Sequence, residues 1–256
     1  MSAHDKKHEP GPSSSFDEAS ALSACQAALG RQVADQRFFD RRGRAVTLSE
    51  FYGRPIVISL IYTSCYHTCP TLTNHLARIA KVARAAVGED SFSVLTIGFD
   101  TSADTPARMQ TFARERGIDH AHWRFLTADA TTIASLTRDL GFTFFRSPNG
   151  FDHIVQTTVL DAKGNAYRQI YGEGFDPPNL VEPLKQLVFG TKANTSTLSG
   201  WINGVRLLCT IYDPSSERYR FDYSLLVAIG VGLISLGAVG VFIVRAWRQS
   251  NSPTTV

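Results

Sequence analysis

The stretch that most constrains the fold is an apolar run, Pro55 to Ile61, which leads directly into Tyr62-Thr63-Ser64-Cys65-Tyr66-His67-Thr68-Cys69-Pro70. From Thr71 onward, apolar residues recur at helical spacing. The two cysteines of this stretch therefore lie where a buried strand passes into a helix. Because the N–H groups and the dipole at a helix N-terminus favour thiolate, the pair either does redox chemistry or binds a soft metal.

Composition narrows the class of protein. The 256 residues can hold one domain of ordinary size plus appendages. A net charge of +3, without a Lys/Arg block interleaved with aromatic residues, argues against nucleic-acid binding. The cysteines are too few for a disulfide-built scaffold and suit one functional pair with two singletons. They are Cys25, Cys65, Cys69 and Cys209.

The order of predicted elements indicates an α/β fold. The patterns predict two short strands within 38–48, strands 55–61 and 91–99, helices 71–87, 105–116 and 129–140, a hairpin of 153–160 with 166–171, and a helix 180–189. This order is typical of a thioredoxin-like sheet, with helices on both faces and the cysteines at the first long helix. Strands 55–61 and 91–99 are expected to be parallel, since a helix connects them.

A long apolar segment follows this domain. Positions 224–244 form a run of 21 residues without a charge. At about 1.5 Å per residue, a helix of this length spans a hydrocarbon core of roughly 30 Å. We therefore expect a thioredoxin-like domain followed by a single C-terminal transmembrane helix. Arg245 and Arg248 favour a cytoplasmic C-terminus, although Arg218 and Arg220 before the run weaken that bias.

The chain is expected to divide into five parts. They are a disordered N-terminal tail at 1–26, the thioredoxin-like domain at 27–190, a juxtamembrane linker at 191–222, the transmembrane helix at 223–246 and a short tail at 247–256. The first residues are rich in Ser, Pro, His and charge and have little to bury. Residues 1–30 contain no apolar signal-peptide region, so the C-terminal helix or an upstream segment would have to direct export.

The spacing of the cysteines leaves two kinds of chemistry open. Three residues separate Cys65 from Cys69, which permits a disulfide and also lets both sulfurs face one ion. Copper(I) is the soft cation that two thiolates and an imidazole suit best. We expect Pro70 at the first helical position and Cys69 at the N-cap.

A third ligand would be a histidine. His153 precedes strand 154–160, in the loop that a thioredoxin-like sheet places against the cysteine loop, although a histidine at a strand start is more often structural. The other histidines of the domain fit less well. His67 is expected to point away from a shared metal, His75 to be a surface or packing residue, and His120 and His122 to lie in a loop beside Trp123.

Three motifs in this order resemble the Sco/SenC family. They are Tyr-Thr-Ser-Cys-x-x-x-Cys-Pro after one apolar strand, Asp100-x-x-x-Asp104-Thr105-Pro106 after the next, and Asp152-His153 before a late strand. The resemblance covers about residues 30–190. It implies a membrane-tethered, thioredoxin-like domain that binds copper, as Cu(I) or Cu(II), through Cys65, Cys69 and His153. It also implies a role in assembling the dinuclear copper centre of cytochrome c oxidase, by copper delivery, by reduction of target cysteines, or both.

The resemblance also implies partners and a location. The partners would be the copper-bearing subunit of the oxidase and an upstream copper donor. The location would be the bacterial inner membrane, with a single span and the domain in the periplasm, although family members carry the anchor before the domain. Asp100 and Asp104 match an acidic motif that contacts copper donors or partners, or else they form a helix-capping turn. Cys209 is either an auxiliary thiol at the membrane surface or an inert, partly buried cysteine.

The leading hypothesis is therefore a copper metallochaperone, a metal carrier and not a turnover enzyme. The alternative is a thiol-disulfide oxidoreductase or thiol peroxidase of the same fold, with Cys65 and Cys69 as its redox pair. A redox-active sensor that acts through partners would share the site. His153 favours the copper hypothesis, because simple dithiol exchange has no evident use for it.

Overall fold

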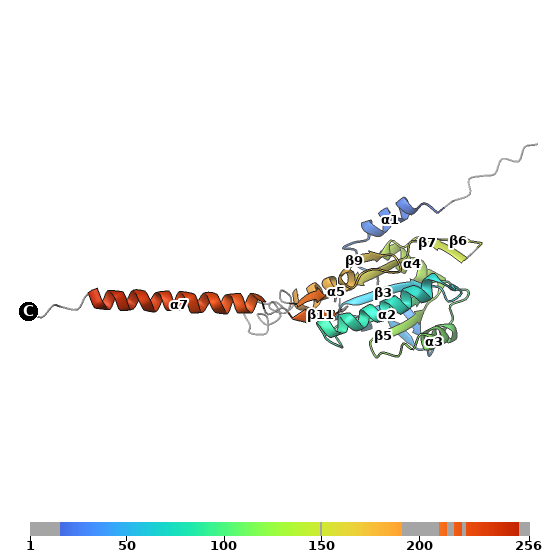
Figure 1. Ribbon diagram of the computed structural model, residues 1–256. Helices are drawn as coiled ribbons and strands as arrows, with labels where there is room; N and C mark the ends of the chain where they lie inside the picture. Colours follow the sequence, from blue (N-terminus) through green and yellow to red (C-terminus); the bar gives the residue numbers. More distant parts are fainter. Residues whose placement is uncertain (1–15, 149, 191–209, 214–217, 222–223, 251–256) are drawn as a thin grey trace, which may run out of the picture. The chain divides into compact units, whose positions relative to one another are not determined.

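A computed structural model describes residues 16–148, 150–190, 210–213, 218–221 and 224–250 of the chain (Figure 1). The chain divides into two units, Met1–Thr191 and Lys192–Val256. The first unit contains the predicted thioredoxin-like domain with its cysteine pair. The second contains the long apolar run.

The first unit is built on a central sheet. Its described strands follow the order β2-β1-β5-β4-β3-β8-β9. They are β1 Arg37–Asp40, β2 Ala45–Thr47, β3 Ile56–Ile61, β4 Ser93–Gly98, β5 Trp123–Thr127, β8 Gln156–Leu160 and β9 Ala166–Tyr171. β3 pairs with β4 in parallel and with β8 in antiparallel orientation. Every residue of β3 and β4 is buried, because layers cover both faces of the sheet at its centre.

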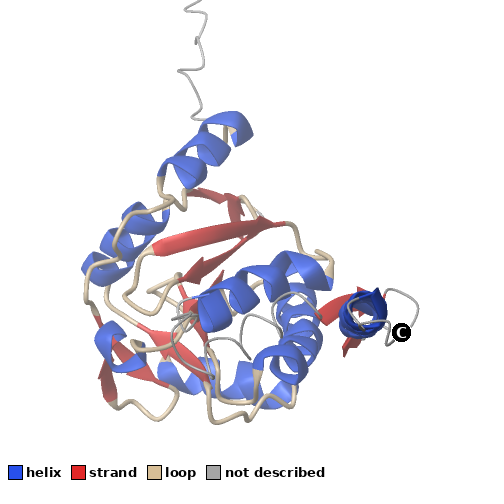
Figure 2. Cartoon of the chain, turned by 90° about the vertical axis from the view of Figure 1, so that its left-hand side faces the viewer, coloured by secondary structure: helices blue, strands red, loops and turns tan. Residues whose placement is uncertain are grey.

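Helices cover the two faces of this sheet, as Figure 2 shows. Those after β3 are α2 Thr68–Val87, α3 Pro106–Glu115, α4 Ala130–Leu140 and α5 Pro177–Lys185, and a short turn, η1 Leu48–Phe51, precedes β3. α2 buries an apolar stripe that includes Leu72, Leu76 and Ile79. α5 packs beside α2 and is followed by the helical turn η2 Gln186–Gly190. Phe175 precedes α5, and its carbonyl accepts a hydrogen bond of 2.7 Å from Nε2 of His75 on α2. His75 is thus a packing residue, as predicted.

Two elements near the site differ from the sequence prediction. Trp123, expected in a loop, begins strand β5, where its Nε1 donates to Thr96 Oγ1 at 3.0 Å. A separate hairpin, β6 Phe144–Ser147 with β7 Gly150–His153, precedes β8. His153 therefore ends this hairpin, and β8 begins later than predicted, at Gln156. Both elements are short, which leaves little periodicity for a sequence pattern to show.

The N-terminal part of the described chain is helical. Helix α1 covers Glu18–Ala27, so the prediction of disorder up to residue 26 is wrong for residues 18–26. Asp17 caps this helix, since its carboxylate accepts from the backbone N–H groups of Ala19 and Ser20. Cys25 lies on the buried face of α1, with its sulfur 2.8 Å from Gln156 Oε1, and burial raises the pKa of its thiol to about 11. Cys25 is therefore a packing residue.

The second unit holds an antiparallel pair of strands and one long helix. β10 Thr210–Asp213 pairs with β11 Arg218–Phe221, and helix α7 covers Ser224–Ser250. Large apolar side chains of α7, including Ile234 and Phe242, are exposed. Within the described part of the chain, no helix is both long enough and apolar enough to cross a membrane. Cys209 lies outside the described residues.

Candidate thiol and metal site

The cysteine turn, residues 62–69, connects β3 to α2. Cys65 N donates to the carbonyl of Tyr62 at 3.1 Å, which closes a tight turn after the strand. Both the backbone N–H and the hydroxyl of Thr71 then bond the carbonyl of His67, at 3.1 and 2.8 Å. The helix consequently begins at Thr68 with His67 at the N-cap, so our placement of Cys69 at the N-cap and Pro70 at the first position is wrong. Cys69 instead lies within the first helical turn.

The two sulfurs of this turn are hydrogen-bonded and differ sharply in acidity. Both cysteines are free, Cys65 half-buried and Cys69 only 3% exposed. The thiol of Cys69 donates to Cys65 Sγ, and so does the Cys69 backbone N–H, at 3.3 Å. These bonds, with others from His67 N–H and the Tyr62 hydroxyl, lower the pKa of Cys65 to about 4. The same hydrogen bond from the Cys69 thiol to Cys65 Sγ, together with burial, raises the pKa of Cys69. Cys65 is thus a thiolate at neutral pH, and Cys69 is its protonated partner.

His153 faces the same cavity as Cys65. This cavity measures about 460 Å³ and is lined by Phe16, Tyr62, Cys65, Thr68, Phe151, Asp152, His153 and Val155. His153 Nδ1 donates to the carbonyl of Ile154 at 2.9 Å, which leaves the lone pair on Nε2. Burial lowers the pKa of His153, so its imidazole is neutral at neutral pH. A neutral imidazole with a fixed tautomer is the form that binds a metal ion.

An aromatic cluster holds His153 beside the end of the sheet. The ring of Phe99, which follows β4, lies 5.5 Å from the imidazole of His153, 5.4 Å from Tyr62 and 5.2 Å from Phe151. All three contacts are edge-to-face, the arrangement that aromatic quadrupoles favour. The hairpin that carries His153 is therefore packed onto the carboxyl ends of β3 and β4.

The acidic motif lies under the cysteine turn. Asp104 is only 4% exposed, and burial raises the pKa of its carboxyl. One oxygen, Oδ1, accepts from both the N–H and the hydroxyl of Thr63, and Oδ2 accepts from the N–H of Asp100 at 2.9 Å. Asp100 is also buried, and its carboxylate accepts from Ser102. The N-cap of α3 is Thr105, so the two aspartates stabilise the turn after β4 without capping the helix themselves.

The structure brings the predicted site residues together only in part. Cys65 contacts Cys69, and His153 shares a cavity with Cys65. Among the described residues, however, no three His, Cys, Asp or Glu side chains are grouped closely enough to hold a metal ion. His120 and His122 lie in the turn before β5 and pair with Glu89 and Asp90.

Sequence reasoning missed two residues of the site. Tyr62 donates its hydroxyl to Cys65, and the only signal for this role was its position three residues before that cysteine. Phe16 lines the Cys65 cavity, although it precedes the domain that the sequence pattern defined. No pattern in the sequence could have shown this, because the contact depends on how α1 folds back.

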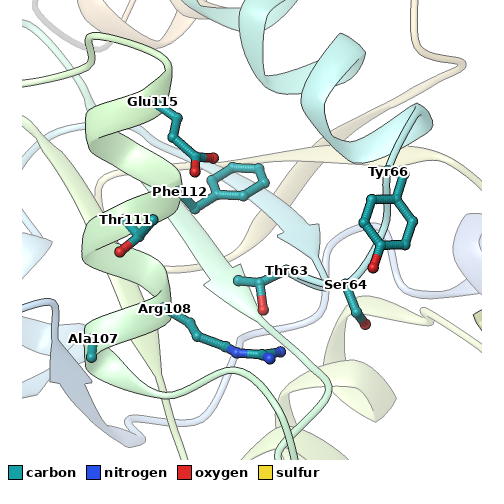
Figure 3. Close-up of a pocket in the computed structure, with 8 residues that line it drawn as sticks. All are labelled: Thr63, Ser64, Tyr66, Ala107, Arg108, Thr111, Phe112 and Glu115. Atoms are coloured by element: carbon teal, nitrogen blue, oxygen red, sulfur yellow. The ribbon is translucent and has the colours of Figure 1, made fainter.

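A second cavity, of about 360 Å³, lies between the cysteine turn and α3. Figure 3 shows Arg108 and Glu115 extending from α3 toward the turn that carries Thr63, Ser64 and Tyr66, and Thr111 of α3 also lines the cavity. Phe112 lies between them, and Tyr66 is 96% exposed. Neither cysteine is among the residues that line this cavity. The thiolate of Cys65 therefore opens toward His153 and away from α3.

The fold and the site define a thioredoxin-like protein with a reduced cysteine pair at the first long helix of its domain. A family model for SCO1/SenC matches residues 27–188. Since this match covers well over half of the chain, the chain belongs to the SCO1/SenC family, which confirms the resemblance seen in the sequence.

A curated relative agrees with this assignment. The SCO1 protein homolog of Bacillus subtilis (strain 168) is 25% identical over 130 residues, which are 50% of this chain and 65% of that protein. The match thus spans slightly less than two thirds of that relative. A solved structure of a candidate electron transfer protein from Aquifex aeolicus VF5 is 29% identical, with a TM-score of 0.57 over 61% of this chain and 92% of that one.

Two further solved structures share the fold. Bradyrhizobium japonicum ScoI with copper bound is 22% identical, with a TM-score of 0.52 over 61% of this chain and 99% of that one. BsSco, described as a member of the Sco family of cytochrome c oxidase assembly proteins, is 20% identical, with a TM-score of 0.55 over 62% of this chain and 95% of that one. At these identities the likeness concerns the fold alone, and it confirms the predicted thioredoxin-like α/β architecture.

Proposed function

We propose that this protein carries copper as its cargo, bound by Cys65, Cys69 and His153, and delivers it to the dinuclear copper site of cytochrome c oxidase. The observation that carries the proposal is that a thiolate and a neutral imidazole face one cavity, with Nε2 of His153 as the free donor atom. Soft thiolate donors with imidazole are the set that copper(I) prefers. The copper-bound ScoI structure and the described assembly role of the BsSco family support the same function.

Binding by all three donors requires a local change. Cys69 must release its proton, which it shares with Cys65, because thiolate is the ligating form. His153 must also approach the sulfurs, since the described side chains form no closed group of three. The hairpin β6–β7 that ends in His153 forms its own two-stranded sheet, so it can shift without breaking the hydrogen bonds of the central sheet.

The same pair of thiols suits a second function, reduction of a disulfide in the target protein. The Cys65 thiolate would attack one sulfur of that disulfide, forming a mixed disulfide and releasing one target thiolate. Cys69, after losing its proton to solvent, would attack Cys65 Sγ and release the second target thiolate. Two electrons pass to the target, and Cys65 and Cys69 end as a disulfide. The observation that favours this function is the low pKa of Cys65 beside a buried thiol.

We also propose where the protein works. The uncharged run at 224–244 supports a single C-terminal anchor in the bacterial inner membrane, with residues 27–190 in the periplasm and Arg245 and Arg248 on the cytoplasmic side. Reporters fused after residue 190 and at the C-terminus test this topology. A periplasmic reporter should be active only at the first position, and activity at both positions would contradict the anchor.

Anaerobic titration of the whole protein with copper(I), in competition with a chromophoric chelator, tests the main proposal. We expect one tightly bound equivalent in the wild type and weak binding in Cys65→Ala, Cys69→Ala and His153→Ala. His75→Ala is a matched control, because His75 lies on α2, bonds the carbonyl of Phe175 and does not line the Cys65 cavity. If the wild type fails to compete for copper yet exchanges disulfides readily, the oxidoreductase function replaces the copper carrier.

A further inference from the structure

The segment that precedes the family domain reaches the thiol site. The SCO1/SenC match begins at residue 27, whereas α1 and the residue before its cap, Phe16, lie upstream of that point. Phe16 nevertheless lines the cavity that contains Cys65 and His153. One wall of the site therefore comes from outside the part of the chain that the family shares.

Contacts along α1 fix the position of this wall. Ala21 and Cys25 are 3% and 1% exposed, and the Cys25 sulfur lies between Gln156 Oε1 and the carbonyl of Gly141. Gly141 ends α4 with φ of +67°, and a Cβ at this position would lie 2.2 Å from the carbonyl oxygen of Ala24. Such close backbone approach shows that α1 is docked tightly against the end of α4.

Phe16 also contacts the hairpin that carries His153. Its ring packs edge-on against Phe145 of β6, with 6.2 Å between centroids. Phe145 is 42% exposed and lies opposite Asp152 in the register of the hairpin. Phe16 thus connects a tightly docked helix to the edge of the hairpin, at the side of the cavity that Cys65 faces.

We propose that Phe16 is a specificity-determining residue, which narrows the access to Cys65 and admits slim reactants while excluding bulky ones. Reactants of the first kind present a copper ion or an unbranched thiol on an extended chain. Bulky aromatic thiols and disulfides are of the second kind. The inference rests on the proposed use of Cys65 as the reacting thiolate, and it does not require that copper be the cargo.

The test compares a small and a bulky thiol reagent on the whole, reduced, metal-free protein at one pH. Iodoacetamide is the small reagent and 5,5′-dithiobis(2-nitrobenzoic acid) the bulky one. The loss of reduced Cys65 is followed by mass spectrometry of its peptide, which counts both the reagent adduct and the Cys65–Cys69 disulfide that forms when Cys69 displaces the aromatic thiolate. We expect Phe16→Ala to raise the rate with the bulky reagent roughly fivefold or more, and the rate with iodoacetamide less than about twofold. Phe39→Ala is the matched control, since Phe39 is a part-exposed phenylalanine on β1, which is not among the strands that line the cavity.

A second variant distinguishes the effect of the Phe16 ring on access to Cys65 from a general loosening of α1 in Phe16→Ala. Phe16→Trp keeps an aromatic ring at the rim and should slow the bulky reagent without slowing iodoacetamide. Equal rates with the bulky reagent in wild type and Phe16→Ala would overturn the inference, as would an equal rise with both reagents. Failure of copper binding in the titration leaves these rate ratios unchanged, so the two proposals can fail separately.

Discussion

Asp104 Oδ1 accepts two hydrogen bonds from Thr63, one from its backbone N–H and one from its hydroxyl, each at 2.7 Å. The second oxygen of the carboxylate accepts from the backbone of Asp100. One buried side chain therefore joins the turn after β4 to the residue two positions before Cys65. Gly98 leaves the space for this carboxylate, because a Cβ there would lie 2.6 Å from the Asp104 side chain.

Replacing Asp104 should destabilise the protein strongly. Asp104→Ala leaves the N–H and hydroxyl of Thr63 without their acceptor, and we expect the free energy of unfolding to fall by roughly 2–4 kcal/mol. Asp104→Asn keeps one carbonyl acceptor and should lie between this variant and the wild type. Urea denaturation measures the effect. Asp119→Ala serves as the control, because Asp119 is exposed and should leave stability nearly unchanged. An equal, small effect of both alanine variants would show that the Asp104 contacts do not hold the turn.

The acidity of Cys65 gives a direct kinetic prediction. With a pKa of about 4, Cys65 is fully ionised above about pH 6, so its alkylation rate should be flat between pH 6 and 8. An ordinary cysteine would react about tenfold faster for each pH unit in this range. In Cys69→Ala the strongest donor to Cys65 is lost, and the rate should again rise with pH. A wild-type rate that climbs steadily to pH 8 would show that Cys65 is an ordinary thiol.

The hydroxyl of Tyr62 should lower the pKa of Cys65 without being needed for the fold. Tyr62→Phe removes the hydroxyl that donates to Cys65 and keeps the ring packed against Phe99 and Phe151. We expect the pKa of Cys65 to rise, by less than in Cys69→Ala, because the bond from Cys69 is the larger cause of the shift. The midpoint of the alkylation rate against pH measures this change. If Tyr62→Phe raised the pKa more than Cys69→Ala does, the assigned order of donors would be wrong.

The parts of the fold that the sequence predicted well are those with a strong local signal. β3 and β4 are continuous apolar runs because both their faces are buried, and α2 has a clear apolar stripe. β5 and the β6–β7 hairpin were missed because strands of four or five residues are too short to show a clear periodicity. The start of α2 was placed too late because its first turn, from Thr68, precedes the apolar spacing; local hydrogen bonds from Thr71 to the carbonyl of His67 form this turn.

In the candidate site, too, the residues that could be predicted are those with a local signal in the sequence. The cysteine motif and Asp152-His153 have fixed spacings that identify the family, so Cys65, Cys69 and His153 could be named in advance. The clamp from Asp104 to Thr63 and the wall at Phe16 depend on contacts between residues 41 or more positions apart. The spacing of residues along the chain does not predict such long-range contacts, and only the folded structure shows them.

The packing of α1 on α4 depends on a single glycine. Gly141→Ala would place a Cβ against the carbonyl of Ala24 and force a strained, left-handed backbone, so we expect a loss of roughly 2–4 kcal/mol. Gly30→Ala separates the two causes, because Gly30 also has positive φ but no atom within 4 Å of the added Cβ. This control should cost only about 1 kcal/mol. Equal losses in thermal or urea unfolding would mean that the contact with Ala24 does not contribute.

Cys25 should make the stability of the protein depend on pH in the alkaline range. Burial raises the pKa of its thiol from 9.0 to about 11 in the folded state, so between these values the unfolded chain loses a proton that the folded protein keeps. The contribution of Cys25 is therefore complete below about pH 9 and is lost as the pH rises toward 11, by roughly 3 kcal/mol at most. Urea unfolding of Cys25→Ala should show a flatter decline above pH 9 than the wild type, even though the variant starts lower.

Cys65→Ala separates this effect from a general alkaline destabilisation. The folded pKa of Cys65 lies near 4, below its unfolded value, so its contribution grows between pH 4 and 9 and is constant above. Removing Cys65 should therefore change the slope of stability against pH between about pH 4 and 9, whereas removing Cys25 leaves the slope in that range unchanged and alters it only above pH 9. Parallel curves for wild type and Cys25→Ala above pH 9 would mean that the Cys25 thiol ionises as easily in the folded protein as in the unfolded chain. That result would contradict the tight docking of α1, which is what keeps this sulfur out of water.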